Sequence, residues 1–152
     1  MNKLQSLFAE LRALDWCHRA AHWQSSGSTS YQEHLLFERL YGNTVEEIDT
    51  FAEKLVGTYG NEAVAPLLGV VATAWYIKAA GVAGDSVSTA LEAEERFLRH
   101  IQGVMDSEDL SVGMENFLGG VADKHETHTY LLKQHLIDVP LETEWGPTLV
   151  EE

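Results

Sequence analysis

The chain has 152 residues, 45% of them hydrophobic, so a single globular domain with its own buried core is expected. Its formal net charge is −14 at pH 7, and the Lys and Arg residues are scattered along the sequence without forming a basic patch. A surface this acidic repels nucleic acid and anionic membranes and attracts cations. The composition therefore excludes a protein that binds DNA through clustered positive charge.

The cysteine content and the apolar stretches indicate in which cellular compartment the protein is expected. Cys17 is the single cysteine, which rules out an intrachain disulfide and predicts an inert thiol in a reducing compartment. Met1 leads directly into an amphipathic pattern, so we expect no signal peptide and a cytoplasmic location. The most apolar stretch, residues 64–84, contains Pro66 and Lys78, and is predicted to be a short buried or interfacial helix rather than a membrane span.

The first half of the chain predicts two long helices. Apolar residues recur at helical spacing from about Lys3 to Trp23, and again from Ser30 to about Val56, with a polar turn at 25–30 between them. Ser30 and Glu33 form a capping-box pattern at the start of the second helix. Two glycines follow this helix as stop signals, Gly57 and Gly60.

The second half predicts a crossover and two more long helices. The connection at 61–88 contains a short helix over 72–79, and its length lets neighbouring helices run parallel. A third long helix is expected from Thr89, capped with Glu92, to about Asp106, and a fourth from about Val112 to Ile137. The sum is an all-α, ferritin-like four-helix bundle in one domain, residues 1–152, whose acidic C-terminal tail occupies residues 138–152.

Two histidines and two carboxylates in the first half have the composition of a metal site. His22, His34, Asp49 and Glu53 offer imidazole nitrogens and carboxylate oxygens, a set suited to iron or zinc rather than calcium. His34 and Asp49 lie ~22 Å apart on one unbroken helix, so one metal cannot contact both within a chain. Two antiparallel copies of this helix about a two-fold axis, crossing near Gly42, would bring them together. The spacing therefore predicts a metal site shared between subunits.

The motifs around these residues resemble the Dps family, the mini-ferritins named as DNA-binding proteins from starved cells. The resemblance rests on His22-Trp23, the Gly27 turn, His34, Glu38 and the stretch 49–54, with ligand spacings of 12, 15 and 4 residues. A second motif at 126–132 is similar to the family's fourth-helix motif, with Tyr130 where a tryptophan is usual. The short helix in the long connection also fits, so the resemblance covers essentially the whole chain.

The resemblance implies a hollow dodecamer that oxidises ferrous iron at sites on two-fold axes, with hydrogen peroxide preferred over dioxygen, and stores the ferric mineral inside. His22 and His34 would come from one subunit and Asp49 and Glu53 from its partner. Glu38 would complete a second, weaker iron site, and Trp23 would take stray oxidising equivalents. Zinc is an alternative occupant of the same ligands. In the family, acidic positions near the start of the fourth helix line iron-admitting pores. The acidic residues of that region here fit either this role or ordinary surface charge and helix capping: Asp106, Glu108, Asp109 and Glu115.

Some features depart from the family or suggest other functions. DNA-binding members carry a lysine-rich tail, whereas this tail is acidic, so we expect no strong DNA binding. His125 and His128 are three residues apart rather than four, which excludes a zinc-protease helix, and His128 is expected to pack or hydrogen-bond within the bundle. The alternatives are a nucleoid-compacting or structural shell with a vestigial site, a zinc, manganese or iron site acting on another substrate, and a dimer without a cavity.

Overall fold

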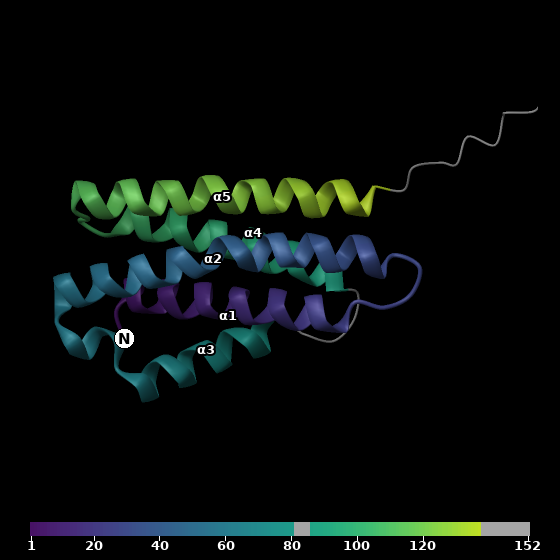
Figure 1. Ribbon diagram of the computed structural model, residues 1–152. Coiled ribbons are helices and arrows are strands. Elements are labelled where there is room, and N and C mark those ends of the chain that lie inside the picture. Colours follow the sequence, from purple (N-terminus) through teal and green to yellow (C-terminus); the bar gives the residue numbers. More distant parts are fainter. Residues whose placement is uncertain (81–85, 138–152) are drawn as a thin grey trace, which may run out of the picture.

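Four long helices form the body of the described part of the protein, and Figure 1 shows how they lie side by side. The structure, a computed structural model, describes residues 1–80 and 86–137, with no side chains described for 67, 68 and 86. The long helices are α1 (Lys3–Gln24), α2 (Ser30–Tyr59), α4 (Ser86–Ser107) and α5 (Val112–Leu136). A 3-10 turn, η1 (Asn61–Val64), and the shorter α3 (Pro66–Ala80) connect α2 to the second pair. The described residues contain no strand, which confirms the all-α prediction.

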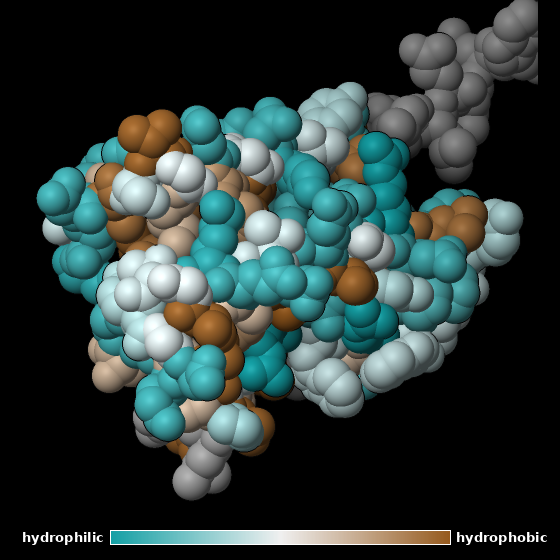
Figure 2. Space-filling view, turned by 60° about the vertical axis from the view of Figure 1, so that its left-hand side comes forward, coloured by the Kyte–Doolittle hydropathy of each residue, from teal (hydrophilic) through white to brown (hydrophobic). Residues whose placement is uncertain are grey.

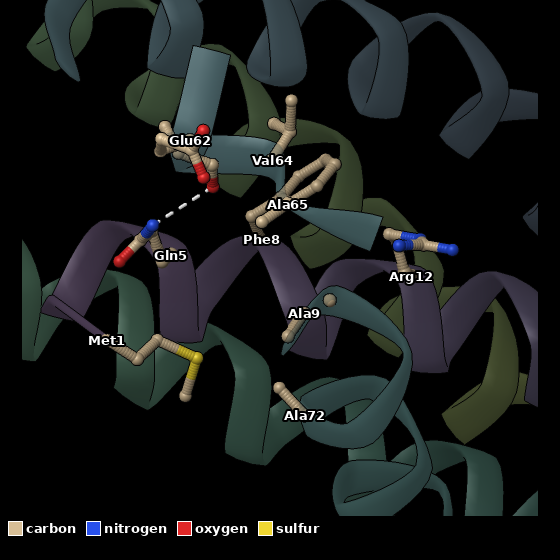
Figure 3. Close-up of a pocket in the computed structure, with 11 residues that line it drawn as sticks. Met1, Gln5, Phe8, Ala9, Arg12, Glu62, Val64, Ala65 and Ala72 are labelled. Atoms are coloured by element: carbon tan, nitrogen blue, oxygen red, sulfur yellow. Dashed lines mark hydrogen bonds between the residues drawn. The ribbon is translucent and has the colours of Figure 1, made fainter. Parts of the chain in front are cut away.

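The connection through η1 and α3 is the crossover that the sequence predicts. α1 and α2 form one antiparallel pair, and α4 and α5 form another (Figure 1). α3 runs back along the outside of α1, so α4 starts at the same end of the bundle as α2 and runs parallel to it. Gln5 of α1 holds the connection in place, since its Nε2 donates to the backbone oxygen of Ala63 at 3.0 Å beside a small pocket (Figure 3).

The core consists of two hydrophobic clusters separated by a buried polar layer. The larger cluster contains Leu11, Phe51 and Phe97, and the smaller one contains Phe37 and Leu132. Between them along the bundle lies a layer of side chains from all four long helices, each at most 3% exposed: His18, Glu47, Glu94, His125 and His128. Aliphatic and aromatic burial on both sides supplies the hydrophobic stabilisation of the bundle.

The ends of α2 differ from the prediction in two details. Thr29, not Ser30, is the N-cap, and its hydroxyl donates to Glu33 Oε1 at 2.9 Å rather than accepting from the backbone, so the predicted capping box is wrong. The helix continues through Gly57 and ends at Tyr59, followed by Gly60 as its C-cap, whose φ is +83°. A left-handed φ is favourable only for glycine, which explains why Gly60 and not Gly57 is the stop.

The other boundaries of the second half also need adjustment. α3 begins at Pro66, a position that suits the first turn of a helix, and is longer than the predicted 72–79. α4 is already helical at Ser86, so the start predicted at Thr89 with Glu92 as capping partner is wrong. α5 continues through the adjacent glycines Gly119 and Gly120 and agrees with its prediction to within one residue. The predicted tail at 138–152 lies outside the described residues.

α3 exposes much of its apolar surface. By length and composition alone, residues 61–80 could cross a membrane, but the segment is divided at Ala65 between η1 and α3. One side of α3 packs on α1, where Tyr76 and Ser6 share a 2.6 Å hydrogen bond. On its other side three large apolar residues are more than half exposed: Val70, Val71 and Trp75. On the face shown in Figure 2, hydrophobic side chains lie in separate groups among hydrophilic ones.

Candidate metal centres

The structure brings His22 and His34 together across the turn between α1 and α2. Their rings stack with centroids 3.7 Å apart. His22 Nδ1 lies 2.9 Å from the backbone oxygen of His34, and His34 Nδ1 lies 3.1 Å from the backbone oxygen of His22. The two histidines therefore hold each other through a reciprocal pair of hydrogen bonds, with Tyr41 packed edge-on against His22.

These hydrogen bonds determine which nitrogen of each ring can bind a metal. A carbonyl oxygen only accepts, so both Nδ1 atoms carry the hydrogen and both Nε2 atoms of the neutral rings keep a lone pair. A metal-binding histidine typically donates its other nitrogen to a carbonyl or carboxylate in this way. The pair therefore presents two oriented imidazole ligands before any metal arrives.

Asp49 and Glu53 lie together elsewhere on α2. Both are exposed, one turn apart, on the same helix as His34. Because α2 is unbroken from Ser30 to Tyr59, the ~22 Å separation of His34 and Asp49 stands. Within one chain the structure thus forms the histidine pair and the carboxylate pair but does not bring the two pairs together.

The face of α2 around Asp49 is a shallow, largely apolar hollow. It is lined by Gly42, Val45, Ile48, Asp49 and Ala52 together with Glu46. Val45 is 54% exposed, an unfavourable position for a valine that stays in water. Gly42 faces open space in this chain, since a Cβ atom built on it would meet no other atom within 4 Å. The hollow is therefore suited to close contact with another apolar surface.

The remaining residues named from the resemblance are all near the surface. Glu38 is exposed one turn after His34. Trp23 is 64% exposed and packs edge-on against Trp16 at 5.9 Å. At the α4–α5 turn, Glu108 pairs with Lys3 at 3.0 Å and Asp106 accepts from Gln102 at 2.8 Å, while Asp109 and Glu115 are exposed.

The sequence reasoning missed a second cluster, in the buried polar layer. Glu94 Oε1 accepts from His18 Nε2 at 2.7 Å and from His128 Nδ1 at 3.0 Å, and Glu94 Oε2 accepts from His125 Nδ1. His125 Nε2 in turn lies 3.2 Å from Glu47 Oε2. The structure confirms that His128 hydrogen-bonds within the bundle. The signal that was available is the spacing of His125 and His128, which places both on one face of α5.

The charges in this cluster support one another. Burial opposes ionisation of Glu94, but the charge of His125 and the hydrogen bonds from three histidines outweigh it and hold the pKa of Glu94 well below its usual range. Burial likewise disfavours protonated His125, but the carboxylates of Glu94 and Glu47 outweigh it and raise the pKa of His125 to about 9. For His128 burial dominates and lowers the pKa. Glu94 and His125 therefore form a buried ion pair at neutral pH.

Comparison with known proteins identifies the fold. No family model matches the chain. A low temperature-induced protein of Nostoc sp., itself uncharacterised, is 27% identical over 127 residues, which cover 80% of this chain and 70% of that protein. Among solved structures, Dps92 from Deinococcus radiodurans superposes with a TM-score of 0.74 at 24% identity, covering 91% of this chain and 86% of the other. DpsC from Streptomyces coelicolor gives 0.71 at 29% identity, covering 91% and 84%.

Proposed function

Because the chain has a Dps-like, ferritin-like fold, we propose that it oxidises ferrous iron and stores the ferric product. The observation that carries this proposal is the stacked pair His22 and His34, whose Nδ1 atoms both donate to carbonyls, so that each Nε2 keeps its lone pair. Oriented imidazoles next to open coordination positions suit a redox-active divalent metal.

Each residue has a distinct role in this proposal. His22 and His34 bind ferrous iron through Nε2, and Asp49 and Glu53 of the partner subunit complete the site with carboxylate oxygens. Glu38, one turn from His34, contributes to a second, weaker position. Two ferrous ions then lose one electron each, and hydrogen peroxide takes both electrons and two protons to become two water molecules. Dioxygen is the alternative oxidant, and zinc competes for the same ligands without undergoing redox chemistry.

The assembly we propose is a homo-oligomer, a hollow dodecamer with these sites on its two-fold axes. Two features support it. The ligand pairs are separated along one helix, so a complete site requires a second chain. The apolar hollow around Asp49 and the exposed side of α3 are surfaces that a second copy would cover. In this assembly, the acidic turns between α4 and α5 would attract ferrous ions to pores through the shell. A location in the cytoplasm stays a prediction.

Iron oxidation by variants tests the proposal. Ferrous iron is added without oxygen, hydrogen peroxide is pulsed in, and ferric absorbance and particle mass are followed for the wild type and the His22→Ala/His34→Ala variant. We expect rapid oxidation in a large particle for the wild type and loss of at least about tenfold in rate for the variant. His135→Ala is the matched control, because His135 is a histidine outside the proposed ligand set, paired with Glu33 at 3.5 Å. Oxidation no faster than in buffer for the wild type would instead favour a structural shell.

A further inference from the structure

Burying the polar layer costs desolvation free energy, so stability alone does not favour it. Five ionisable side chains from four helices lie there, and each loses its hydration. Replacing such buried ionic groups with apolar residues of similar size is often neutral or stabilising. The network is also incomplete among the described residues, since His18 Nδ1 is buried without a hydrogen-bond partner. Stability alone is therefore a weak explanation for this layer, and a bound cation would offset the cost of burying its carboxylates.

Three side chains of the layer form a compact donor set. His18 from α1, Glu94 from α4 and His128 from α5 each place one ligand atom within 4.8 Å of the others, and all three are 0% exposed. The two histidine nitrogens lie 2.7 and 3.0 Å from the same carboxylate oxygen. Ligand atoms around a tetrahedral zinc ion with bonds of about 2.0–2.2 Å lie roughly 3.3–3.6 Å apart, so each nitrogen would move about 0.3–0.9 Å away from that oxygen.

Neighbouring residues can support the protonation state that a metal requires at His128 and can orient the carboxylate of Glu94. If His128 binds through Nδ1, its Nε2 carries the hydrogen and needs an acceptor. The side-chain amide of Asn43 lies 3.0 Å from that Nε2 and, turned over, offers its oxygen. His125 Nδ1 meanwhile holds the second oxygen of Glu94 and fixes the plane of the carboxylate.

We propose that His18, Glu94 and His128 bind one divalent first-row transition metal ion, such as zinc or ferrous iron, inside the bundle of each chain. Two imidazoles and one carboxylate favour these metals over calcium or magnesium. The positive ion offsets the two buried carboxylates, Glu94 and Glu47. This site lies within one chain, whereas the site of the proposed function needs two, and it does not depend on that function.

A surface hollow lies on the side of the bundle where the buried polar layer comes nearest to solvent. It lies between α2 and α5 and contains Glu47 and Lys124, whose charged atoms are 3.4 Å apart. Glu47 then contacts His125, which contacts Glu94. Since the ligands themselves are fully buried, metal exchange into the folded chain is expected to be slow. Loading is therefore best done while the protein refolds.

Cobalt binding during refolding tests this site without the surface site. The His22→Ala/His34→Ala variant is unfolded with chelator, freed of chelator and refolded with excess Co²⁺ or Zn²⁺, and unbound metal is removed. We expect about one metal ion per chain, visible Co²⁺ bands indicating nitrogen and oxygen ligands, and a melting temperature several degrees above that of chelator-refolded protein. Refolded protein with no bound metal and an unchanged melting temperature would overturn the proposal, whatever the iron oxidation assay gives.

A pair of neighbouring carboxylates provides the matched control. In the same background, Glu94→Gln keeps the shape of the side chain but removes a ligand, whereas Glu95→Gln alters only a partly exposed residue paired with Lys133 at 2.8 Å. We expect Glu94→Gln to weaken Co²⁺ binding by more than the roughly 10–100-fold typical of losing a supporting hydrogen bond, and Glu95→Gln to bind normally. A folded Glu94→Gln variant with unchanged affinity would also overturn the proposal, and if it does not fold, the refolding measurement decides.

Discussion

At the scale of single residues, the two groups of histidines differ in what their Nδ1 atoms contact. His22 and His34 donate Nδ1 to backbone carbonyls, which leaves a lone pair on Nε2, whereas His125 and His128 donate Nδ1 to the carboxylate of Glu94. The first group could be predicted from short spacings and a resemblance. For the second, the sequence indicates only that His125 and His128 share a helix face, because the cluster is held by contacts 31 to 78 residues apart that a single sequence does not reveal.

The raised pKa of His125 predicts how stability depends on pH. Its folded pKa of about 9 exceeds the ordinary value of 6.5, so its contribution is fully present below pH 6.5 and is lost as the pH rises toward 9. With chelator present, the free energy of unfolding by urea should fall between these values. His125→Gln should flatten that dependence, and His135→Gln should retain it. An equally steep fall in His125→Gln would contradict the assignment.

Glu94 predicts the opposite dependence in acid. Its folded pKa is lowered, so its contribution is present above the ordinary value of 4.5 and is lost as the pH falls. Acid unfolding of chelator-treated protein, followed by circular dichroism, should therefore begin at a higher pH in Glu94→Gln than in Glu95→Gln. Identical acid midpoints would show that the buried ion pair contributes nothing.

Cys17 is expected to react slowly. Burial raises the pKa of its thiol to about 11, although the positive charge of Arg96 opposes this. Few thiolate anions then form near neutral pH, and the thiolate is the reactive species. Labelling by a disulfide reagent at pH 8 should be much slower than in urea-unfolded protein. Similar rates in both states would mean that the thiol is accessible and activated.

At the scale of elements, helical periodicity and turn residues predicted the long helices, and the errors lie at their ends. Thr89 and Glu92 have the spacing of a capping box, yet α4 already includes them, because a favourable local pattern can also occur inside a helix. Gly57 and Gly60 have the same local signal, and only the backbone conformation distinguishes them. The boundary depends on packing between α2 and η1, which the sequence of either segment does not contain.

These two glycines make a matched pair for stability. Gly60→Ala forces a Cβ into φ +83° and should destabilise the protein by about 1–3 kcal/mol. Gly57→Ala lies inside α2 with nothing within 4 Å of the new Cβ, so it should stabilise by about 0.5–1 kcal/mol. Urea unfolding of both variants measures the difference. Destabilisation by Gly57→Ala equal to that of Gly60→Ala would contradict the boundary at Gly60.

At the scale of the whole molecule, the bundle and its crossover could be predicted because four apolar periodicities and one long connection leave few arrangements. The separation of His34 from Asp49 could also be predicted, since it depends only on the rise of an unbroken helix. The polar layer that divides the core could not be predicted, because its position depends on how the four helices align along the bundle. The central claim at this scale is that one metal site takes ligands from two chains.

Co-assembly of two defective variants tests that claim most directly. His34→Ala and Asp49→Ala chains are mixed unfolded in equal amounts and refolded together, and peroxide-driven iron oxidation is measured. In a mixed pair, one site receives intact histidines from one chain and intact carboxylates from the other, so about a quarter of wild-type sites should return. His22→Ala mixed with His34→Ala is the control and should recover nothing, because every histidine pair is damaged. Recovery near a quarter in the first mixture alone is the predicted result, and no recovery in either would contradict a site shared between subunits.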